Sequence, residues 1–433
     1  DGMNIVRKAC EIPVRNRTEV LVVGAGPAGF GAAVSAARAG AKVTLVEQGG
    51  LLGGMWTLGL LSPFFDNQNK DGLNRELREA LRARDAWGGL WDISFDQCEM
   101  ALLLDEYVSK CGIDLLLHTM GSEPIVEDSV LKGIYIQNKS GTQAVLADVV
   151  IDCTGDGDIA ARSGAPFEIG RESDGVFQPM TMMFKIGGLR PDYGRDDLRS
   201  WYDVLIQKLP EAEILADIPY NNPALITLPR KGEALIQWTH VKRSLGTVAD
   251  ELTAATLEGR RQVRRALECF KLVKEQLGDV YLLDLPSMIG VRETRRITGE
   301  YVISDDDVKS GRKQPDAVCR VQFGVDIHEP EKPEQNCWQH PGFDIPYRSL
   351  VPLKVENLLT AGRCISGSFA AHAAYRVTGD CLAMGEAAGR AAARAVSAAS
   401  QSTGASSSAV SPLPMTRSAR PRRLKMLTVR DRS

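Results

Sequence analysis

The first pattern with chemical potential is a run of glycines, Gly24-Ala25-Gly26-Pro27-Ala28-Gly29, between an apolar segment and an alanine-rich segment. After a strand and before a helix, the first glycine permits a tight turn. The second lets backbone amides approach a phosphate, and the third lets the helix lie against the sheet. The start of the helix offers N–H groups and partial positive charge to that phosphate. Glu47 ends the next predicted strand, where a carboxylate accepts hydrogen bonds from a ribose hydroxyl. The pattern therefore predicts a dinucleotide site.

Two histidines and several arginines are candidates for acid–base chemistry and anion binding. His372 and Arg376 are four residues apart, so a helix would place a base and an anion-binding group on one face. His240 ends an apolar segment and is a second candidate base. Arg292 belongs to a basic cluster, residues 292–296, in which one arginine is a candidate for binding an anionic substrate. Structural histidines and internal salt bridges are the alternatives for these residues.

Two other clusters contain residue types that bind metals. His328, Cys337 and His340 fall in one predicted loop, but no fourth ligand follows at a fixed spacing, so we expect no metal site there. Three aspartates, 305–307, follow Ser304 at the start of a predicted helix. We interpret them as a helix capping box rather than a cation site.

The composition is typical of an α/β protein with a mildly acidic body. The net charge is −3, and basic residues concentrate after residue 416, which argues against nucleic acid as the main ligand. The nine cysteines are scattered without a C-x-x-C pair, which favours reduced thiols and a cytoplasmic location. No run of eighteen apolar residues occurs, so we expect no membrane span.

The elements that must position these groups follow an alternating strand and helix pattern. Residues 18–48 predict a βαβ unit, and residues 133–152 predict antiparallel strands that lead back to the sheet. Residues 250–277 predict one long helix that ends at Gly278. We predict four regions: a nucleotide-binding domain in two parts, 18–165 and 348–397, an inserted substrate domain, 166–347, and a disordered tail, 398–433.

Five motifs occur in order along the chain: the glycine run, Gly53-Gly54-Met55, Thr154-Gly155-Asp156-Gly157-Asp158, residues 290–296, and Ala361-Gly362-Arg363-Cys364-Ile365. Together they resemble the FAD-dependent oxidoreductase family of the glutathione-reductase-like superfamily, over about residues 18–397. The resemblance implies an α/β fold. In this fold a Rossmann-like FAD-binding domain, a βαβ unit with a β-meander, is interrupted by an inserted α+β substrate domain.

The resemblance also implies FAD as the cofactor and a role for particular positions. The glycine run would face the pyrophosphate, Glu47 the adenosine ribose, and the start of the last helix the flavin. The implied cofactor-binding residues are Gly24, Gly26, Pro27, Ala28, Gly29, Glu47, Gln48, Gly53, Gly54, Met55, Thr154, Gly155, Asp156, Gly362, Arg363, Thr378 and Gly379. The implied position of His372 beside the flavin makes it the preferred base, and Arg376, His240 and Arg292 are the other candidate catalytic residues.

Two missing motifs narrow the predicted reaction. No cysteine pair follows the second glycine stretch, which argues against a dithiol mechanism, and no second G-x-G-x-x-G unit for NAD(P)H is present. We therefore predict hydride transfer between a small polar organic substrate and flavin N5, with an electron acceptor that the sequence does not identify. Two alternatives stay open: a reductase that receives electrons from a partner protein, and an FAD-binding subunit without catalysis. A homo-oligomer is compatible with the sequence.

Overall fold

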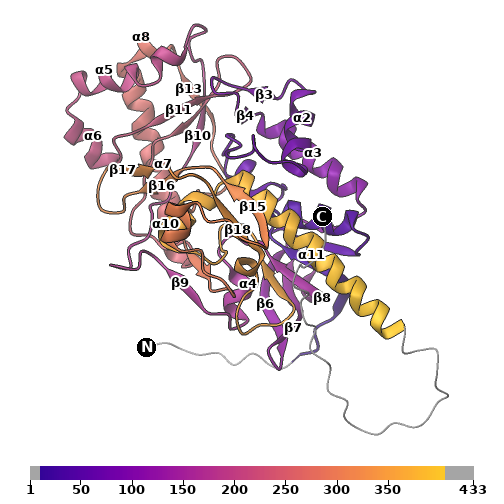
Figure 1. The fold of residues 1–433 in the computed structure, drawn as a ribbon. Helices are drawn as coiled ribbons and strands as arrows, with labels where there is room; N and C mark the ends of the chain where they lie inside the picture. The colour runs from indigo at the N-terminus through magenta and orange to yellow at the C-terminus, as the bar shows by residue number, and fades with distance from the viewer. Residues whose placement is uncertain (1–9, 405–433) are drawn as a thin grey trace, which may run out of the picture.

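The computed structural model describes residues 10–404, and its largest element is a seven-stranded sheet flanked by helices (Figure 1). The strands of this sheet are β1 (Val14–Val23), β2 (Val43–Val46), β5 (Asp114–Leu116), β6 (Met120–Glu127), β7 (Val130–Asn138), β8 (Gly141–Asp152) and β19 (Leu358–Thr360). Their order is β5-β2-β1-β8-β7-β6, and β19 pairs with β8 beside this path.

The sheet combines a parallel centre with an antiparallel edge. Strands β5, β2, β1 and β8 are parallel, with Val23 opposite both Val46 and Asp152. Strands β7 and β6 continue antiparallel from β8 as the predicted meander, although β6 is absent from the sequence prediction. Strand β19 runs parallel to β8. Segments before residue 165 and after residue 348 therefore share one sheet.

Helix α1 (Pro27–Arg38) and helix α11 (Thr378–Gly404) pack against each other and against this sheet; α11 is the long yellow helix in Figure 1. A Cβ atom at Gly385 would lie 1.9 Å from the carbonyl oxygen of Ala28, so only glycine permits the observed approach. The small residues of α11 thus let it pack on the helix that follows the glycine run, as the sequence predicts.

The end of α11 differs from the sequence prediction. The helix reaches Gly404, whereas the sequence predicts its end at 397 and a disordered tail from 398. No proline or glycine interrupts residues 398–403, so nothing in this stretch stops the helix. The rest of the predicted tail lies outside the described residues.

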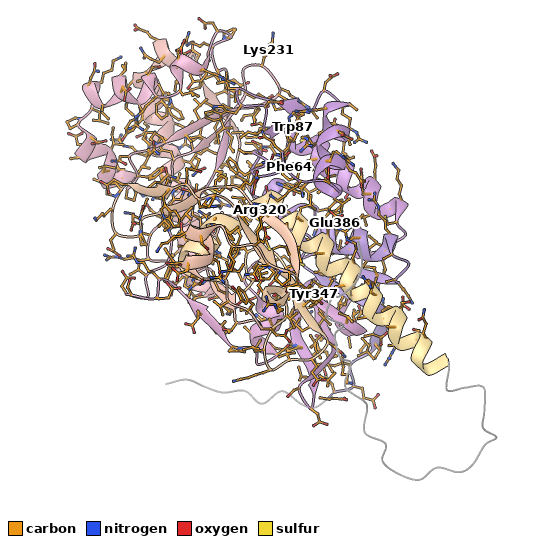
Figure 2. All side chains as sticks on the ribbon, viewed as in Figure 1. Phe64, Trp87, Lys231, Arg320, Tyr347 and Glu386 are labelled. Atoms are coloured by element: carbon orange, nitrogen blue, oxygen red, sulfur yellow. The ribbon has the colours of Figure 1, made fainter. Side chains whose placement is uncertain are left out.

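A group of short elements packs beside α1 and α11. These elements are η1 (Gly54–Trp56), α2 (Leu73–Arg82), β3 (Trp87–Gly88), β4 (Ser94–Phe95) and α3 (Gln97–Lys110). Glu386 of α11 accepts a hydrogen bond from the backbone N–H of Leu73 at 3.1 Å and so ties α2 to α11 (Figure 2). Phe64 and Trp87 fill the space on the other side of these helices, with ring centroids 6.2 Å apart.

A second, four-stranded antiparallel sheet has its own hydrophobic core. Its strands in order are β11 (Ala224–Thr227), β12 (Ala234–Gln237), β10 (Phe184–Gly187) and β13 (Tyr281–Asp284). The helices of this part are η2 (Arg195–Asp197), α5 (Ser200–Lys208), α6 (Glu211–Asp217), α7 (Ala249–Leu272) and α8 (Lys274–Leu277). The predicted single helix over 250–277 is wrong, because Val273 is completely buried in this core with a non-helical backbone and separates α7 from α8.

The remaining elements are short and connect the two sheets. They are α4 (Asp158–Arg162), β9 (Phe167–Ile169), β14 (Arg295–Ile297), α9 (Asp305–Ser310), β15 (Ala317–Val321), β16 (Val325–His328), β17 (Gln335–Trp338), β18 (Phe343–Pro346), η3 (Tyr347–Leu350) and α10 (Phe369–Tyr375). Apolar side chains of β15, β16 and β18 belong to the same hydrophobic core as α1 and α11. The Ser304 capping box at the start of α9 is confirmed. None of the helices within residues 10–404 is both long and apolar enough to cross a membrane.

Candidate active site

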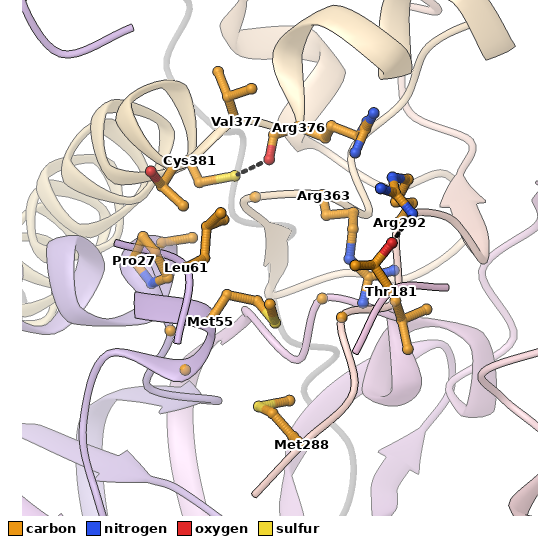
Figure 3. Close-up of a pocket in the computed structure, with 18 of the residues that line it drawn as sticks. Pro27, Met55, Leu61, Thr181, Met288, Arg292, Arg363, Arg376, Val377 and Cys381 are labelled. Atoms are coloured by element: carbon orange, nitrogen blue, oxygen red, sulfur yellow. Dashed lines mark hydrogen bonds between the residues drawn. The ribbon is translucent and has the colours of Figure 1, made fainter. Parts of the chain in front are cut away.

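One cavity of about 1220 Å³ joins the glycine run to the second sheet. This volume exceeds the roughly 300–1,000 Å³ of ordinary small-molecule pockets, so it can hold a large ligand. Figure 3 shows the guanidinium groups of Arg363, Arg292 and Arg376 on one side of the cavity, with Pro27 and Leu61 across from them. We describe the end at the glycine run as the glycine end and the end at Arg292 as the arginine end.

At the glycine end, the backbone itself forms the wall. A Cβ atom at Gly26 would meet nothing within 4 Å, so this position faces open space. The backbone N–H of Gly53 donates to the carbonyl of Ala25 at 2.8 Å, which holds the two glycine loops together. A Cβ at Gly54 would lie 2.9 Å from the Cα of Gly26. No side chain caps the start of α1, which leaves its N–H groups available to an anion.

Three predicted cofactor residues, Gly29, Gly53 and Gly379, do not line the cavity and instead make close packing possible. A Cβ at Gly29 would lie 1.7 Å from the carbonyl oxygen of Gly24, which fits the predicted role of the third glycine in helix–strand packing. A Cβ at Gly379 would lie 2.4 Å from the carbonyl oxygen of Phe65. Their effect on a cofactor is therefore indirect, through the positions of the neighbouring loops.

Glu47 lines the cavity, and its carboxylate is already fixed by the backbone. One oxygen accepts from the N–H of Ala25 at 2.8 Å and the other from the N–H of Gly49 at 2.7 Å. Burial raises the pKa of Glu47, and these hydrogen bonds oppose the increase. Each oxygen keeps a lone pair, so Glu47 can orient both loops and still accept a bond from a ribose hydroxyl. Gln48 follows it along the same wall.

The motif after β8 is organised by a buried carboxylate that the predictions omit. Asp152 is fully buried and accepts hydrogen bonds from the N–H and hydroxyl of Thr154 and from the N–H of Ala160, at 2.7 to 3.0 Å. This arrangement presents Thr154, Gly155 and Asp156 to the cavity. Arg363, an implied cofactor-binding residue, lines the cavity and pairs with Asp156 at 2.8 Å.

Thr378, the first residue of α11, contributes a polar side chain to the wall of the cavity. Its hydroxyl is buried and makes no hydrogen bond to any described residue, although it lines the cavity. A buried hydroxyl without a partner is costly, and a ligand in the cavity can supply the missing partner. Together with the open space at Gly26 and the uncapped start of α1, Thr378 shows that the residues present fit a dinucleotide.

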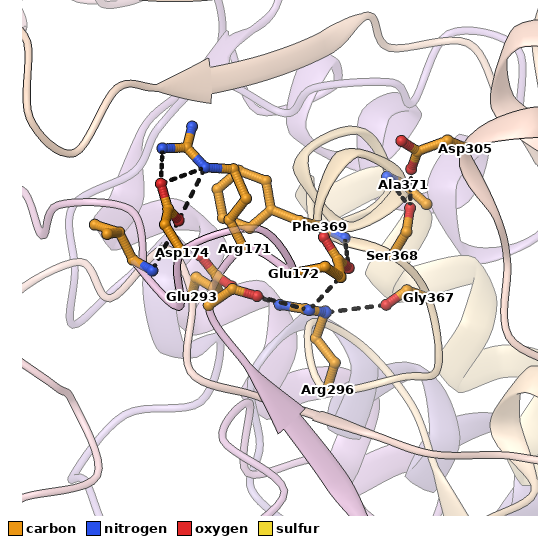
Figure 4. Close-up of polar contacts among 12 residues, drawn as sticks. Arg171, Glu172, Asp174, Glu293, Arg296, Asp305, Gly367, Ser368, Phe369 and Ala371 are labelled. Atoms are coloured by element: carbon orange, nitrogen blue, oxygen red, sulfur yellow. Dashed lines mark hydrogen bonds and ion pairs between the residues drawn. The ribbon is translucent and has the colours of Figure 1, made fainter.

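The arginine cluster at 292–296 divides into two kinds of side chain. Arg295 pairs with Asp158 at 2.9 Å, and Arg296 pairs with Glu293 at 2.6 Å. Figure 4 shows Arg296 bonded to Gly367 and facing Glu293 inside the fold. Arg295 and Arg296 therefore form internal salt bridges, which the sequence analysis gives as the alternative to binding an anionic substrate.

Arg292 differs from its neighbours because it is buried without a carboxylate partner. Its Nη1 donates to the carbonyl of Pro179 at 2.7 Å and to the hydroxyl of Thr181 at 2.6 Å. The side chain is only 7% exposed and lines the cavity. Burial, followed by the charge of Arg376, lowers the pKa of Arg292 to about 9. The guanidinium therefore remains charged at neutral pH.

Arg376 also lines the cavity, as the predictions require. Its Nη2 donates to the carbonyl of Asp326 at 2.8 Å and lies 3.5 Å from a carboxylate oxygen of the same residue. Its Nε is buried and makes no hydrogen bond to any described residue. Burial lowers the pKa of Arg376, and Asp326 opposes this.

His372 occupies a different place from the predicted one. Its ring is completely buried, does not line the cavity and packs edge-on against Tyr375, with centroids 5.6 Å apart. Burial, followed by the charges of neighbouring arginines, lowers its pKa well below 6.5. The expectation that His372 and Arg376 reach the site together is wrong, because the α10 backbone directs only Arg376 into the cavity. The position of His372 gives no support to its predicted role as the base.

His240 does not line the cavity either, but it contacts a histidine that does. His240 Nε2 lies 2.8 Å from His328 Nδ1, and the His240 ring stacks on Tyr220 at 3.7 Å between centroids. His240 Nδ1 lies 3.3 Å from the carbonyl oxygen of Trp238. Since a carbonyl only accepts, His240 carries its proton on Nδ1, and His328 donates to His240 through its own Nδ1.

These contacts leave His328 Nε2 with a lone pair at the arginine end. Nε2 accepts from the amide of Gln335 at 3.1 Å and lies 3.3 Å from a carboxylate oxygen of Asp326. Burial and the charge of Arg292 lower the pKa of His328 to about 3, against the opposing effect of Asp326. His328 is therefore a neutral base beside a carboxylate that would stabilise its protonated form.

His328 and Asp326 are functional candidates that the sequence analysis misses. The sequence analysis considers His328 only together with Cys337 and His340, as residue types that bind metals. In the structure His340 instead hydrogen-bonds the carbonyl of Phe323, so these three side chains do not face a common point. In residues 10–404, no three His, Cys, Asp or Glu side chains are arranged to hold a metal ion. The available signal was the alternation in β16, which places residues 326 and 328 on the same side of a strand.

Residues 19–404 match the family described as FAD dependent oxidoreductase. The chain therefore belongs to the FAD-dependent oxidoreductase family, its cofactor is FAD, and it is an enzyme.

Individual relatives are more distant. Thiamine thiazole synthase of Aeropyrum pernix is 32% identical over 160 residues, which cover 34% of this chain and 57% of that protein. A geranylgeranyl bacteriochlorophyll reductase-like protein of Thermoplasma acidophilum has a similar structure, with 14% identity, a TM-score of 0.45 and coverage of 90% of this chain and 80% of that chain. The flavin-dependent brominase Bmp2 gives 11% identity, a TM-score of 0.47 and coverage of 88% and 79%.

Proposed function

We propose that this enzyme transfers a hydride between a small polar organic substrate and its FAD. The observation that carries the proposal is the single cavity, which is lined at one end by the glycine run and at the other by Arg292, Asp326, His328 and Arg376. FAD supplies the hydride acceptor, N5 of its flavin ring. The glycine end would hold the pyrophosphate and adenosine, and the arginine end would then receive the substrate.

In the proposed reaction, the residues of the arginine end orient the substrate and accept a proton. When an alcohol or amine carbon loses a hydride, the O–H or N–H group must lose a proton in the same two-electron oxidation. His328 Nε2 would accept this proton once the substrate displaces the Gln335 amide that bonds it at 3.1 Å, and Asp326 at 3.3 Å would stabilise the imidazolium that forms. His240 fixes the His328 tautomer through their 2.8 Å contact and acts as a positioning residue.

We also propose that the four-stranded sheet with α5 to α8 acts as the inserted substrate domain. Support comes from its separate hydrophobic core and from the cavity walls, to which this part contributes Met183, Tyr220, Ile226 and Gln237. These side chains would cover the substrate and exclude water. The limits of this domain stay predictions.

An anaerobic reduction experiment tests the proposed function. The FAD-loaded protein is mixed with a panel of alcohols, amines and hydroxy acids, and the flavin absorbance is followed. Rapid bleaching by one substrate supports the proposal. Bleaching only by a reduced electron-transfer protein supports the alternative in which a partner supplies electrons. Turnover with neither reductant would point to an FAD-binding subunit without catalysis.

A further inference from the structure

We propose that the arginine end binds the carboxylate group of an organic monoanion, so that the substrate is a small carboxylic acid. This inference rests on the proposed function, because it names the substrate class of the same site. It is carried by Arg292, which is buried, and Arg376, whose side chain is 13% exposed; both face one cavity.

The first argument is the incomplete pairing of Arg292. Only its Nη1 is bonded, to the neutral acceptors Pro179 O and Thr181 Oγ1. A guanidinium carries five donors, and within the described part of the chain its other nitrogens have no hydrogen-bond partner. Burying a charge without a counter-ion is costly. Two parallel N–H groups match the two oxygens of a carboxylate, so a bound carboxylate would remove this cost.

The second argument is the balance of charge at this end of the cavity. Arg292 and Arg376 are positive, and Asp326 is the carboxylate that lies near both and holds its charge, since its pKa is lowered. His328 is neutral at pH 7 because its pKa is lowered to about 3. Glu293, another acid whose charge acts on Arg376, pairs with Arg296 at 2.6 Å. One positive charge therefore remains uncompensated.

This balance selects a monoanion over a phosphate dianion. A single carboxylate neutralises the excess charge, whereas a second negative charge would meet Asp326 in a buried place. The walls of the cavity also include Met183, Ile226 and Met288. These side chains suit the carbon part of an organic acid. The carboxylate would lie between the arginines, with the carbon to be oxidised near His328.

Binding of simple acids to the FAD-loaded protein tests the inference without requiring turnover. Acetate, propionate and benzoate are compared with acetamide, propionamide and benzamide by calorimetry and by perturbation of the flavin absorbance spectrum. We expect at least one acid to bind and its amide to bind at least about tenfold more weakly, because hydrogen bonds to charged groups are stronger than neutral ones. Sulfate, which is a dianion at neutral pH, should bind more weakly than the acids.

Variants of Arg292 then locate the site. We expect Arg292→Gln to weaken the binding of the acid about 10- to 100-fold and to leave the affinity for the amide almost unchanged. Arg292→Lys keeps the positive charge but loses the paired donors, so its affinity for the acid should lie between those of the wild type and Arg292→Gln. Arg243→Gln is the matched control. Arg243 is exposed, pairs with Glu331 and does not line the cavity, and its substitution by Gln removes the same positive charge.

The outcomes separate this inference from the proposed function. If no acid binds, or if Arg292→Gln changes FAD content or flavin reduction potential without changing acid affinity, the carboxylate site is wrong. If an uncharged alcohol or amine reduces the flavin while acids do not bind, the proposed function stands and the inference fails. If acids bind through Arg292 but no substrate reduces the flavin, the inference stands and the proposed function fails.

Discussion

The glycine end and the arginine end of the cavity are built in different ways. The glycine end consists largely of backbone from short continuous segments, and its shape follows from the absence of side chains at Gly26 and Gly54. The arginine end consists of side chains from distant segments, with Thr181, Arg292, Asp326 and Arg376 brought together by the fold. The first end depends on local geometry and the second on tertiary packing, so the two ends should respond differently to substitution.

The largest expected effect is the loss of FAD from Gly26→Val. A Cβ atom at this position meets no protein atom within 4 Å, so we expect the fold to tolerate the substitution, but the side chain would extend into the space where the pyrophosphate must approach the backbone. We expect a folded, colourless protein, measured by absorbance at flavin wavelengths and by circular dichroism. Full FAD content in this variant would contradict the placement of the pyrophosphate at the glycine end.

Gly29→Ala is the control within the same motif. Its Cβ would lie 1.7 Å from the carbonyl oxygen of Gly24, so the clash is with the protein and not with the ligand. We expect a loss of about 1–3 kcal/mol in the free energy of unfolding, measured by urea denaturation. If this variant is as stable as the wild type, the close helix–strand contact at Gly29 is incorrect.

At the arginine end, we expect His328→Asn to slow flavin reduction by substrate by about a hundredfold or more while FAD stays bound. Asparagine can keep a donor toward His240 but lacks the basic Nε2 atom. Anaerobic stopped-flow measurement of flavin bleaching gives the rate.

His372→Asn is the matched control for that experiment. The His372 ring is buried outside the cavity. This variant should therefore lower the melting temperature, while the rate of flavin reduction stays close to that of the wild type. A hundredfold slower reduction in His372→Asn, together with normal reduction in His328→Asn, would restore His372 as the base and overturn the assignment to His328.

The smallest expected effect is on the pH dependence of stability. Because the pKa of His328 is lowered from 6.5 to about 3, the unfolded state binds more protons than the native state between these values. The free energy of unfolding therefore falls as the pH falls through this window. We expect His328→Asn to reduce this slope in urea titrations between pH 7 and about 5. An unchanged slope would show that His328 titrates normally in the native protein.

The sequence predicted the glycine end well because its chemistry is local. A strand, three spaced glycines and Glu47 follow one another in the chain, and each role depends on neighbouring backbone. A strand at Leu358–Thr360 could also be read from the sequence, because an apolar segment there meets a glycine, but its parallel pairing with β8 is a tertiary contact.

The arginine end could not be predicted in the same way. Among Arg292, Arg295 and Arg296, the sequence does not reveal which one lacks a carboxylate, because Asp158 and Glu293 reach their partners only in the folded protein. The i,i+4 spacing of His372 and Arg376 indicated a shared helical face, but not that one side chain would be enclosed by the core. Side-chain burial depends on long-range packing, which one sequence does not specify.

The orientation of FAD in the cavity tests the account most directly, and a crystal structure of the FAD-loaded protein measures it. We predict the adenosine ribose within hydrogen-bond distance of Glu47, the pyrophosphate at Gly26 and the start of α1, and the flavin ring beside Thr378 with one face toward Arg292 and His328. A flavin ring at the Glu47 end, or one separated from Arg292 and His328 by the walls of the cavity, would contradict the account.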